Sequence, residues 1–287
     1  MSLSGHGSTA GSSPVAAARL LNTLVTQGSF VAALMYYLGA IWSMAYYGYF
    51  HVDAFALGLG FAEFVIHSLG LITTPVVVTG ALAVLLFGSR GTLTRRAALL
   101  PPRAAAQVTR AANALARLHG WLVIAGIVMV LAWRDVQPYG WLAPVAIAAG
   151  ILLGRRRTPT SPGTAAPGRA VPLLAAGLFL LWAATLHAHD LGVADARHTA
   201  GALVHRTAVV VFSVDRLSLT GPPAVTVQDL GDDVRFRYRY TGLRLLIERD
   251  GHYYVLPLGW RAAESSTYVL RENDRMRVEL MPGTWRP

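Results

Sequence analysis

The chain has 287 residues, of which 54% are hydrophobic and 14% are charged, against roughly 25% charged in an average soluble domain. It contains no cysteine, which excludes a disulfide framework, a thiolate nucleophile and a Cys-ligated zinc or iron–sulfur site. The formal net charge is +10, and all 25 basic residues are arginine. Residues 1–189 carry 12 arginines against three acids, whereas residues 190–287 carry 13 against 12. The positive charge therefore belongs to the first two thirds of the chain.

The first 27 residues are predicted to form a cytoplasmic tail, because 1–14 are rich in Ser and Gly and form no apolar run. Five apolar runs follow and predict a helical transmembrane domain over residues 28–189. The runs cover residues 30–50, 61–87, 118–133, 141–153 and 171–186. The first two reach the roughly 20 residues that a helix needs to cross a bilayer. The other three are shorter and depend on their flanks to span it.

The arginines between these runs are concentrated in alternate connections. Residues 88–117 contain six and residues 154–170 contain four, while residues 51–60 and 134–140 contain one between them. Such an asymmetry predicts that the arginine-rich loops face the cytoplasm and contact an anionic inner leaflet. We therefore expect a multi-pass protein of the cell membrane, with a cytoplasmic N-terminus and an extracytoplasmic C-terminal domain. The membrane explains the basic charge, and no nucleic-acid partner is expected.

Seven polar side chains are predicted to lie at the outer level of this domain, and their types suit a metal ion. They are His51, Asp53, Glu63, His67, His187, His189 and Asp190. If they converge, the ligand set suits zinc, although no metallohydrolase spacing is present. A set of separate polar residues that marks where the helices leave the bilayer is the favoured interpretation. No cofactor is predicted, with zinc left open.

Residues 190–205 are predicted to be a linker, and residues 206–287 a small antiparallel β-domain. Short alternating segments separated by turn residues predict its strands. These are Ala208–Val214, Val225–Leu230, Val234–Tyr240, Leu243–Glu248, Tyr253–Leu258, Tyr268–Leu270 and Met276–Leu280. Asp250 and Gly251 between two of these segments indicate a tight hairpin. The fold class is therefore an α+β membrane protein, with about five transmembrane helices followed by a β-sandwich or half-open barrel.

The segment Val234–Tyr240 alternates arginine with apolar or aromatic residues. Because strand residues two apart point to the same face, Arg235, Arg237 and Arg239 are expected on one face and Phe236 on the buried one. The arginines form either a contact surface for anionic lipid, polymer or a partner, or a solvated face balanced by cross-strand acids such as Glu248 and Glu279. The balanced face is favoured because the β-domain is nearly neutral.

No catalytic, nucleotide-binding or pore-filter motif is present. The preferred hypothesis is therefore a non-enzymatic accessory or scaffold subunit that presents the extracytoplasmic β-domain to a membrane-protein partner or a second copy. Two alternatives stay open. One is a membrane-embedded metal-binding protein or enzyme that uses the outer polar residues. The other is a channel or transporter subunit in which Glu63 lines the pathway.

Overall fold

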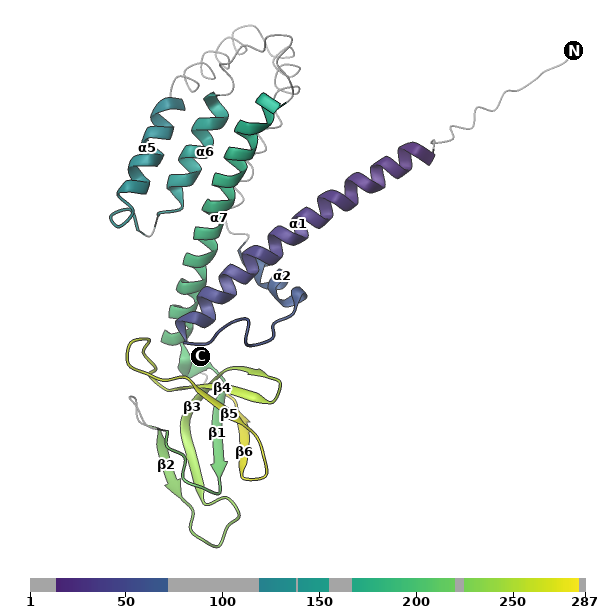
Figure 1. The fold of residues 1–287 in the computed structure, drawn as a ribbon. Coiled ribbons are helices and arrows are strands. Elements are labelled where there is room, and N and C mark those ends of the chain that lie inside the picture. The colour runs from purple at the N-terminus through teal and green to yellow at the C-terminus, as the bar shows by residue number, and fades with distance from the viewer. Residues whose placement is uncertain (1–13, 72–118, 138, 155–166, 220–224, 284–287) are drawn as a thin grey trace, which may run out of the picture.

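A computed structural model describes residues 14–71, 119–137, 139–154, 167–219 and 225–283. Within these ranges the protein is α+β, with two long helices, three shorter ones and an antiparallel sheet at one end (Figure 1). The sheet lies against the ends of the two long helices, and the shorter helices pack along their sides.

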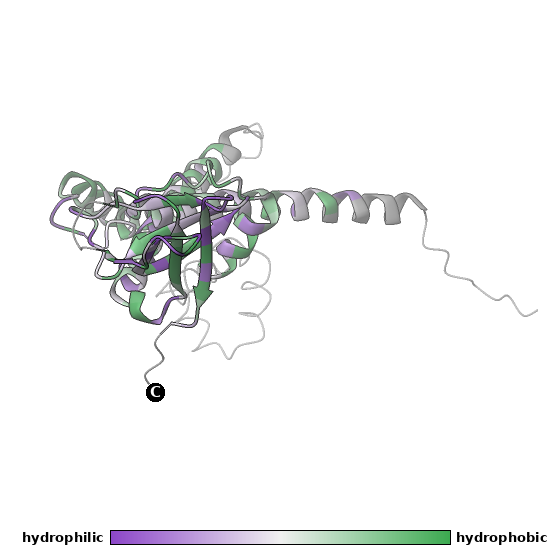
Figure 2. Cartoon of the chain, turned by 90° about the horizontal axis from the view of Figure 1, so that it is seen from below, coloured by the Kyte–Doolittle hydropathy of each residue, from purple (hydrophilic) through white to green (hydrophobic). Residues whose placement is uncertain are grey.

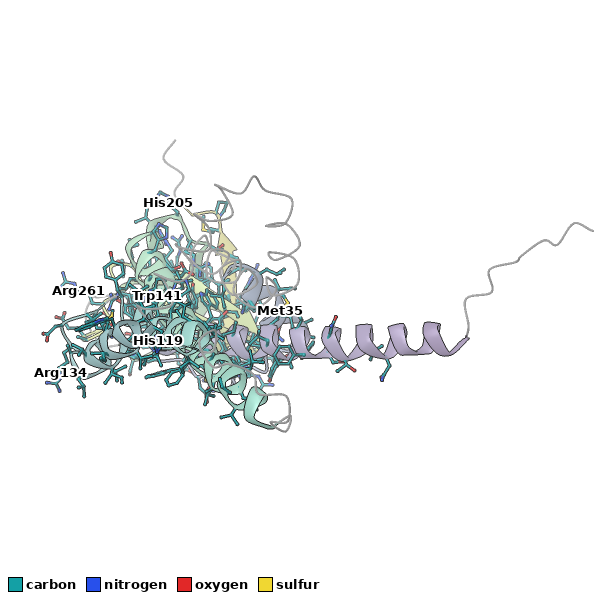
Figure 3. All side chains as sticks on the ribbon, turned by 90° about the horizontal axis from the view of Figure 1, so that it is seen from above. Met35, His119, Arg134, Trp141, His205 and Arg261 are labelled. Carbon is teal, nitrogen blue, oxygen red and sulfur yellow. The ribbon has the colours of Figure 1, made fainter. Side chains whose placement is uncertain are left out.

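The two long helices are α1 (Pro14–Tyr49) and α7 (Pro167–Gly201). Their segments Val25–Tyr49 and Val171–Gly201 are long and apolar enough to cross a membrane, yet only 22% and 17% of their most apolar windows are buried. The core helix of a soluble protein would bury most of such a surface. The first part of α1 extends away from the other described elements (Figure 3). Both helices thus expose the apolar surface that a bilayer would cover.

The shorter helices are α2 (Phe61–Leu69), α5 (His119–Leu131) and α6 (Leu142–Gly154). Helix α5 packs on α6, and α6 packs on α7. Among the described residues two helices are candidate membrane spans and two more are shorter apolar helices, so the predicted bundle of five spans is supported only in part. The remainder of the predicted span 61–87 beyond Leu71, the arginine-rich loop 88–117 and residues 155–166 lie outside the described ranges.

Helix α7 continues through most of the segment predicted to be a linker. It runs to Gly201 and is followed by one 3-10 turn, η1 (Leu203–His205). Small residues at a spacing of four, Ala188, Gly192 and Ala196, make its buried stripe. A Cβ on Gly192 would lie 2.6 Å from the carbonyl oxygen of Trp42, so α1 and α7 nearly touch there. This packing keeps the segment helical, and the 35-residue helix is about 52 Å long, longer than the roughly 30 Å bilayer core.

Glycines also mark the contacts among the other helices. A Cβ on Gly39 of α1 would lie 1.7 Å from the carbonyl oxygen of Phe64 in α2. At the α5–α6 contact, a Cβ on Gly126 would lie 2.5 Å from Ile147, and one on Gly150 2.5 Å from Val123. Close backbone approach through small residues is typical of helices that pack in membranes, where no hydrophobic force draws helices together.

The α5–α6 contact gives a first prediction. Gly150→Ala should lower the free energy of unfolding in detergent by about 1–3 kcal/mol, because the added methyl group overpacks the contact with Val123. Gly120→Ala on α5 is the matched control, since nothing lies within 4 Å of a Cβ there, and it should be neutral or slightly stabilising. Equal effects of the two substitutions in thermal unfolding would show that the helices do not pack through Gly150.

The sheet contains six strands, and every pairing is antiparallel. The strands are β1 (Ala208–Ser213), β2 (Thr226–Asp229), β3 (Tyr238–Arg249), β4 (His252–Pro257), β5 (Tyr268–Arg271) and β6 (Met276–Met281). Their order is β5-β4-β3-β1-β6, with β2 beside the first part of β3. Seen from below, the strands carry both hydrophobic and hydrophilic residues (Figure 2).

The predicted hairpin is confirmed. Asp250 and Gly251 join β3 to β4, with Arg249 opposite His252, and both turn residues have positive φ (49° and 72°), as a two-residue hairpin turn requires. The strands of the described residues form one antiparallel sheet, and not the two packed sheets of a sandwich. The half-open barrel stays a prediction. The end of the predicted strand Val234–Tyr240 and the predicted strand Leu243–Glu248 belong to the single strand β3, inside which Gly242 takes a φ of +87°. Residues 234–237 precede this strand.

One face of the sheet packs against loops of its own domain. Its buried core consists of Val209, Val211, Tyr240, Leu243, Val255 and Leu270, with Leu217, Leu219 and Val225 packed against it. Tyr240 is fully buried, and its hydroxyl accepts the backbone N–H of Leu217 at 2.6 Å. Phe236, which we expected in the core, precedes β3 and is only half-buried. We therefore expect truncation to alanine to cost more stability at Tyr240 than at Phe236.

Candidate functional site: the helix–sheet junction

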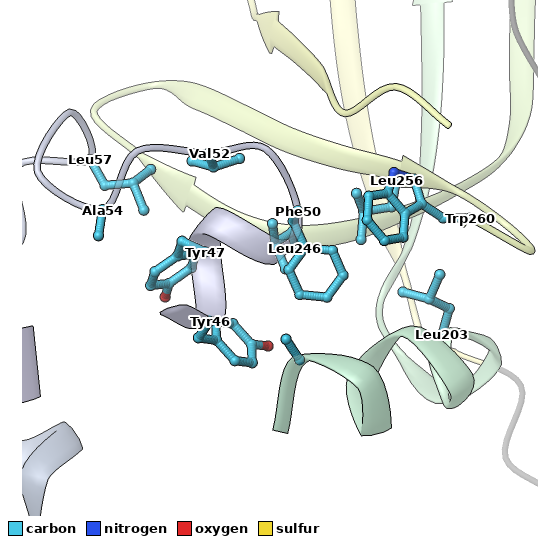
Figure 4. Close-up of a cluster of buried hydrophobic side chains, with 11 residues drawn as sticks. Tyr46, Tyr47, Phe50, Val52, Ala54, Leu57, Leu203, Leu246, Leu256 and Trp260 are labelled. Atoms are coloured by element: carbon cyan, nitrogen blue, oxygen red, sulfur yellow. The ribbon is translucent and has the colours of Figure 1, made fainter. Parts of the chain in front are cut away.

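The other face of the sheet meets the ends of α1 and α7 in a second hydrophobic core, which we call the junction (Figure 4). Its buried members are Tyr46, Tyr47, Phe50, Val52, Ala54, Leu57, Ala196, Leu203, Leu246, Leu256 and Trp260. The ring of Trp260 lies 5.0 Å from that of Phe50 and 5.7 Å from that of Tyr49. Phe50 and Leu256 are fully buried, and burial of each such side chain contributes roughly 1.5–3 kcal/mol. The sheet is therefore docked on the helices.

An ion pair closes the edge of the junction. Both terminal nitrogens of Arg249 donate to Glu63, over 2.7 Å to Oε1 and 2.8 Å to Oε2. One of them also donates to the carbonyl oxygen of Gly58 at 3.0 Å. The two parallel hydrogen bonds fix the guanidinium in the plane of the carboxylate, which adds geometric specificity to the charge attraction. The side chains keep 30% and 37% of their exposure, so solvent screens part of this attraction.

Local structure places both partners of this ion pair. Glu63 lies in the first turn of α2, and its Oε2 accepts the backbone N–H of Gly60 at 2.7 Å, which caps the helix. Arg249 is the last residue of β3, at the hairpin turn. The hydrogen bonds from its guanidinium to Glu63 raise the pKa of Arg249 above its usual value. Two elements that are far apart in the sequence are thus held by one charged contact.

Further hydrogen bonds cross the same junction. The hydroxyl of Thr267, before β5, donates to the carbonyl oxygen of Phe50. Arg206, after η1, donates to the hydroxyl of Tyr46 at 3.1 Å, and that hydroxyl contacts Thr199 of α7 at 3.2 Å. Hydrogen bonds between polar groups at the junction therefore add to the contact between the helices and the β-domain.

The predicted outer polar residues take separate partners. Glu63 is paired with Arg249. His67 contacts the hydroxyl of Ser43 at 2.9 Å, and its ring lies 5.0 Å from that of Trp42. The ring of His187 lies 5.3 Å from that of Trp141. Each side chain serves contacts between neighbouring elements.

The remaining members lie at the surface. Asp53 accepts the backbone N–H of Phe55 in a turn, and not at the start of a helix. His51 is exposed, with its ring 5.7 Å from that of Trp260. His189 and Asp190 lie 3.6 Å apart and are partly exposed. Across the described ranges no group of three or more His, Cys, Asp or Glu side chains comes together, so the convergence that a zinc site requires is not seen there.

The three arginines of the predicted ladder also take different environments. Arg235 is exposed and donates to the carbonyl oxygen of Asp274. Arg237 is paired with Asp229 and Asp232, and these hydrogen bonds lower the pKa of Asp229. The acids that pair with Arg237 are thus at the end of β2 and in the turn that follows it, and not at the positions Glu248 and Glu279 that we expected. Arg239 is half-buried.

Comparisons with known proteins give no relative. No protein-family model, no curated protein and no solved structure matches this chain.

The docking contacts across the junction were not foreseen from the sequence. Glu63 was singled out as an ionisable residue at a predicted span, but its partner Arg249 was noted only for the turn beside it. The two are 186 residues apart, and no periodicity relates them. Each residue carried a local signal in the sequence. Glu63 is an isolated carboxylate at the start of an apolar helix, and Arg249 lies beside the tightest predicted turn.

The junction ion pair gives a second prediction. Arg249→Ala should lower the free energy of unfolding by about 1 kcal/mol, since the pair is bidentate but partly solvated. It should also increase proteolysis at the loop 51–60, because Gly58 loses its hydrogen bond. The matched control is Arg261→Ala, which removes a solvent-exposed pair with Glu264 and should change neither. The combination Glu63→Arg with Arg249→Glu should recover part of the loss, and its failure to do so would contradict the pairing.

Proposed function

We propose that this chain is a multi-pass integral membrane protein that acts as a non-enzymatic accessory or scaffold subunit and presents an extracytoplasmic β-domain to a partner. The observation that carries the proposal is the junction. The sheet is fixed to the helices by a buried aromatic core and the Glu63–Arg249 pair, so it is held in one position relative to the helix ends. A domain held in this way suits a presenting role.

The exposed apolar surface of α1 and α7 supports the membrane location. Phe30 and Leu174 expose 69% and 72% of their surface, which is costly in water and favourable in lipid. The arginine asymmetry supports the orientation, with residues 88–117 and 154–170 in the cytoplasm and the β-domain outside. The anionic inner leaflet is then the first partner of the chain.

The end of the sheet farthest from the helices is the surface that we propose for a partner. The turn between β2 and β3 lies there (Figure 1). Val227, Leu230 and Val234 in and near this turn expose 42%, 39% and 46% of their surface. Close by, an open depression of about 440 Å³ is lined by residues that include Asp215, Leu217 and Arg275. Apolar side chains beside polar ones are typical of protein interaction surfaces.

The contacts of Glu63 can be compared with the two alternative functions, a channel or transporter subunit and a metal-binding protein or enzyme. A channel or transporter role gave it a place in a pathway, but its carboxylate is occupied by Arg249. A metal-binding or enzymatic role required it to share a site with His67, His187 and His189, which take separate partners. These contacts support the accessory role rather than either alternative.

The proposed orientation gives a third prediction, which uses the absence of cysteine. A cysteine placed at Ser266, which is exposed in the β-domain, should react with a membrane-impermeant maleimide in intact cells. A cysteine placed at Ser161 should react only after the cells are permeabilised. The reverse pattern would contradict the orientation, and equal labelling at both positions in intact cells would contradict a membrane-spanning arrangement between them.

The presenting role gives a fourth prediction. A photo-cross-linking amino acid placed at Val227 or Leu230 in living cells should give one discrete adduct, identified by mass spectrometry as the same protein from both positions. The same group at Val269, which is 52% exposed on β5, is the control and should give none. The role would be refuted if the far end gave no adduct, or if all three positions gave the same mixture.

A further inference from the structure

Two arginines lie side by side on the face of the sheet that meets the helices. In the pairing of β1 with β3, Ala208 lies opposite Arg244. Arg206 precedes Ala208 by two residues and has an extended backbone, with ψ of 154°. Residues two apart in an extended segment share a face, and diagonal neighbours on antiparallel strands are within reach of long side chains. Arg206 and Arg244 are therefore diagonal neighbours.

This pair of arginines borders the junction. Leu256, the neighbour of Arg244 on β4, is a fully buried member of the junction core. Arg206 reaches the hydroxyl of Tyr46, another member. Tyr46 lies in the last turn of the candidate span Val25–Tyr49. The pair is thus placed where that span ends, at the level of lipid headgroups if the helix crosses a bilayer.

The hydrogen bonds of these arginines are incomplete. Arg244 is 92% buried, being 8% exposed, and its guanidinium donates to the carbonyl oxygen of Leu243 at 3.1 Å. The Nε atoms of Arg206 and Arg244, and Nε1 of Trp260 in the same junction, are buried without an acceptor among the residues that the structure describes. A buried N–H group without an acceptor costs about 1–3 kcal/mol, and more when it is charged.

The charges are also unbalanced. The ion pairs found within the described ranges include neither Arg206 nor Arg244. Arg249, at the end of the same strand β3, has Glu63 as its partner. Two neighbouring guanidinium groups repel each other when no anion lies between them, and burial weakens the screening of that repulsion. An anionic oxygen group would supply both the missing acceptors and the missing charge.

We propose that Arg206 and Arg244 together bind one phosphate group, that of a phospholipid headgroup in the outer leaflet, with Trp260 as a neighbouring donor. Guanidinium groups match the geometry of phosphate oxygens and bind them through paired hydrogen bonds. The half-buried Arg206 gives the phosphate access from the surface. The bound lipid would then stabilise the docking of the β-domain. This inference does not depend on the identity of a protein partner.

The test is the melting temperature of the full-length protein, purified and delipidated in an uncharged detergent. Phosphatidylglycerol is added to one sample, inorganic phosphate at matched ionic strength to a second, and phosphate-free diacylglycerol to a third. Phosphatidylglycerol in about hundredfold excess over its Kd should raise the melting temperature by about 5 °C or more. Diacylglycerol should not raise it. Stabilisation by inorganic phosphate as well would support the anion site and assign it to a soluble phosphate.

Two variants link the effect to the site. Arg244→Met keeps the length of the side chain and removes its charge, so it should abolish the lipid-dependent shift while leaving the lipid-free protein at least as stable as the wild type. Arg206→Met should also abolish the lipid-dependent shift. This second variant tests the site if Arg244→Met does not fold. Arg271→Met, at an exposed position on β5, is the control and should retain the full shift. The proposal is overturned if no additive stabilises the wild type, or if either junction variant that folds keeps the wild-type shift.

Discussion

The packing of Trp260 and Phe50 at the junction determines where the β-domain lies. The two rings contact each other at the point where α1 ends, and Leu203 holds the end of α7 in the same core. Without this contact the sheet would be joined to the helices through η1 and through the hydrogen bonds of Arg249 and Thr267. Because burial of apolar surface stabilises in proportion to area, the aromatic core supplies most of the docking energy and the Glu63–Arg249 pair fixes its orientation.

This arrangement explains the length of α7. The apolar part of the helix, residues 171–186, is short for a membrane span, and the polar-containing part that follows remains helical to Gly201. Its small buried residues let α1 approach along the whole contact, with Gly192 beside the backbone of Trp42. The last turns of α7 therefore act as a rigid support for the β-domain. A flexible linker would have allowed the domain to reorient, whereas this helix does not.

Part of this fold follows from local sequence signals. Alternation and turn residues were sufficient to predict the strands and the Asp250–Gly251 hairpin, because both depend on the few residues around them. The helical conformation of residues 190–201 did not follow from the sequence, because it accompanies close packing of Gly192 on α1. The strand break expected near Gly242 is not seen, because pairing with β1 continues on both sides of the bend.

Less of the candidate site than of the fold could be predicted from the sequence. The sequence singled out the outer polar residues but not the partners that they take: Glu63 is bound by an arginine of the β-domain, and His67 by a serine of α1. Long-range pairs of this kind leave no periodic pattern. Arg206 and Arg244, which form no ion pair within the described residues, also could not be related from the sequence, because the strand register is what places them on one face.

The central claim is that the β-domain is rigidly docked on the helix ends. The most direct test is a distance measurement between spin labels placed at two exposed positions of this cysteine-free chain, Ala194→Cys on α7 and Gln228→Cys on β2. Pulsed electron paramagnetic resonance on the full-length protein in lipid should give a single narrow distance distribution, and Trp260→Ala should broaden it. A broad distribution in the otherwise unchanged protein would show that the sheet moves freely and would contradict the account.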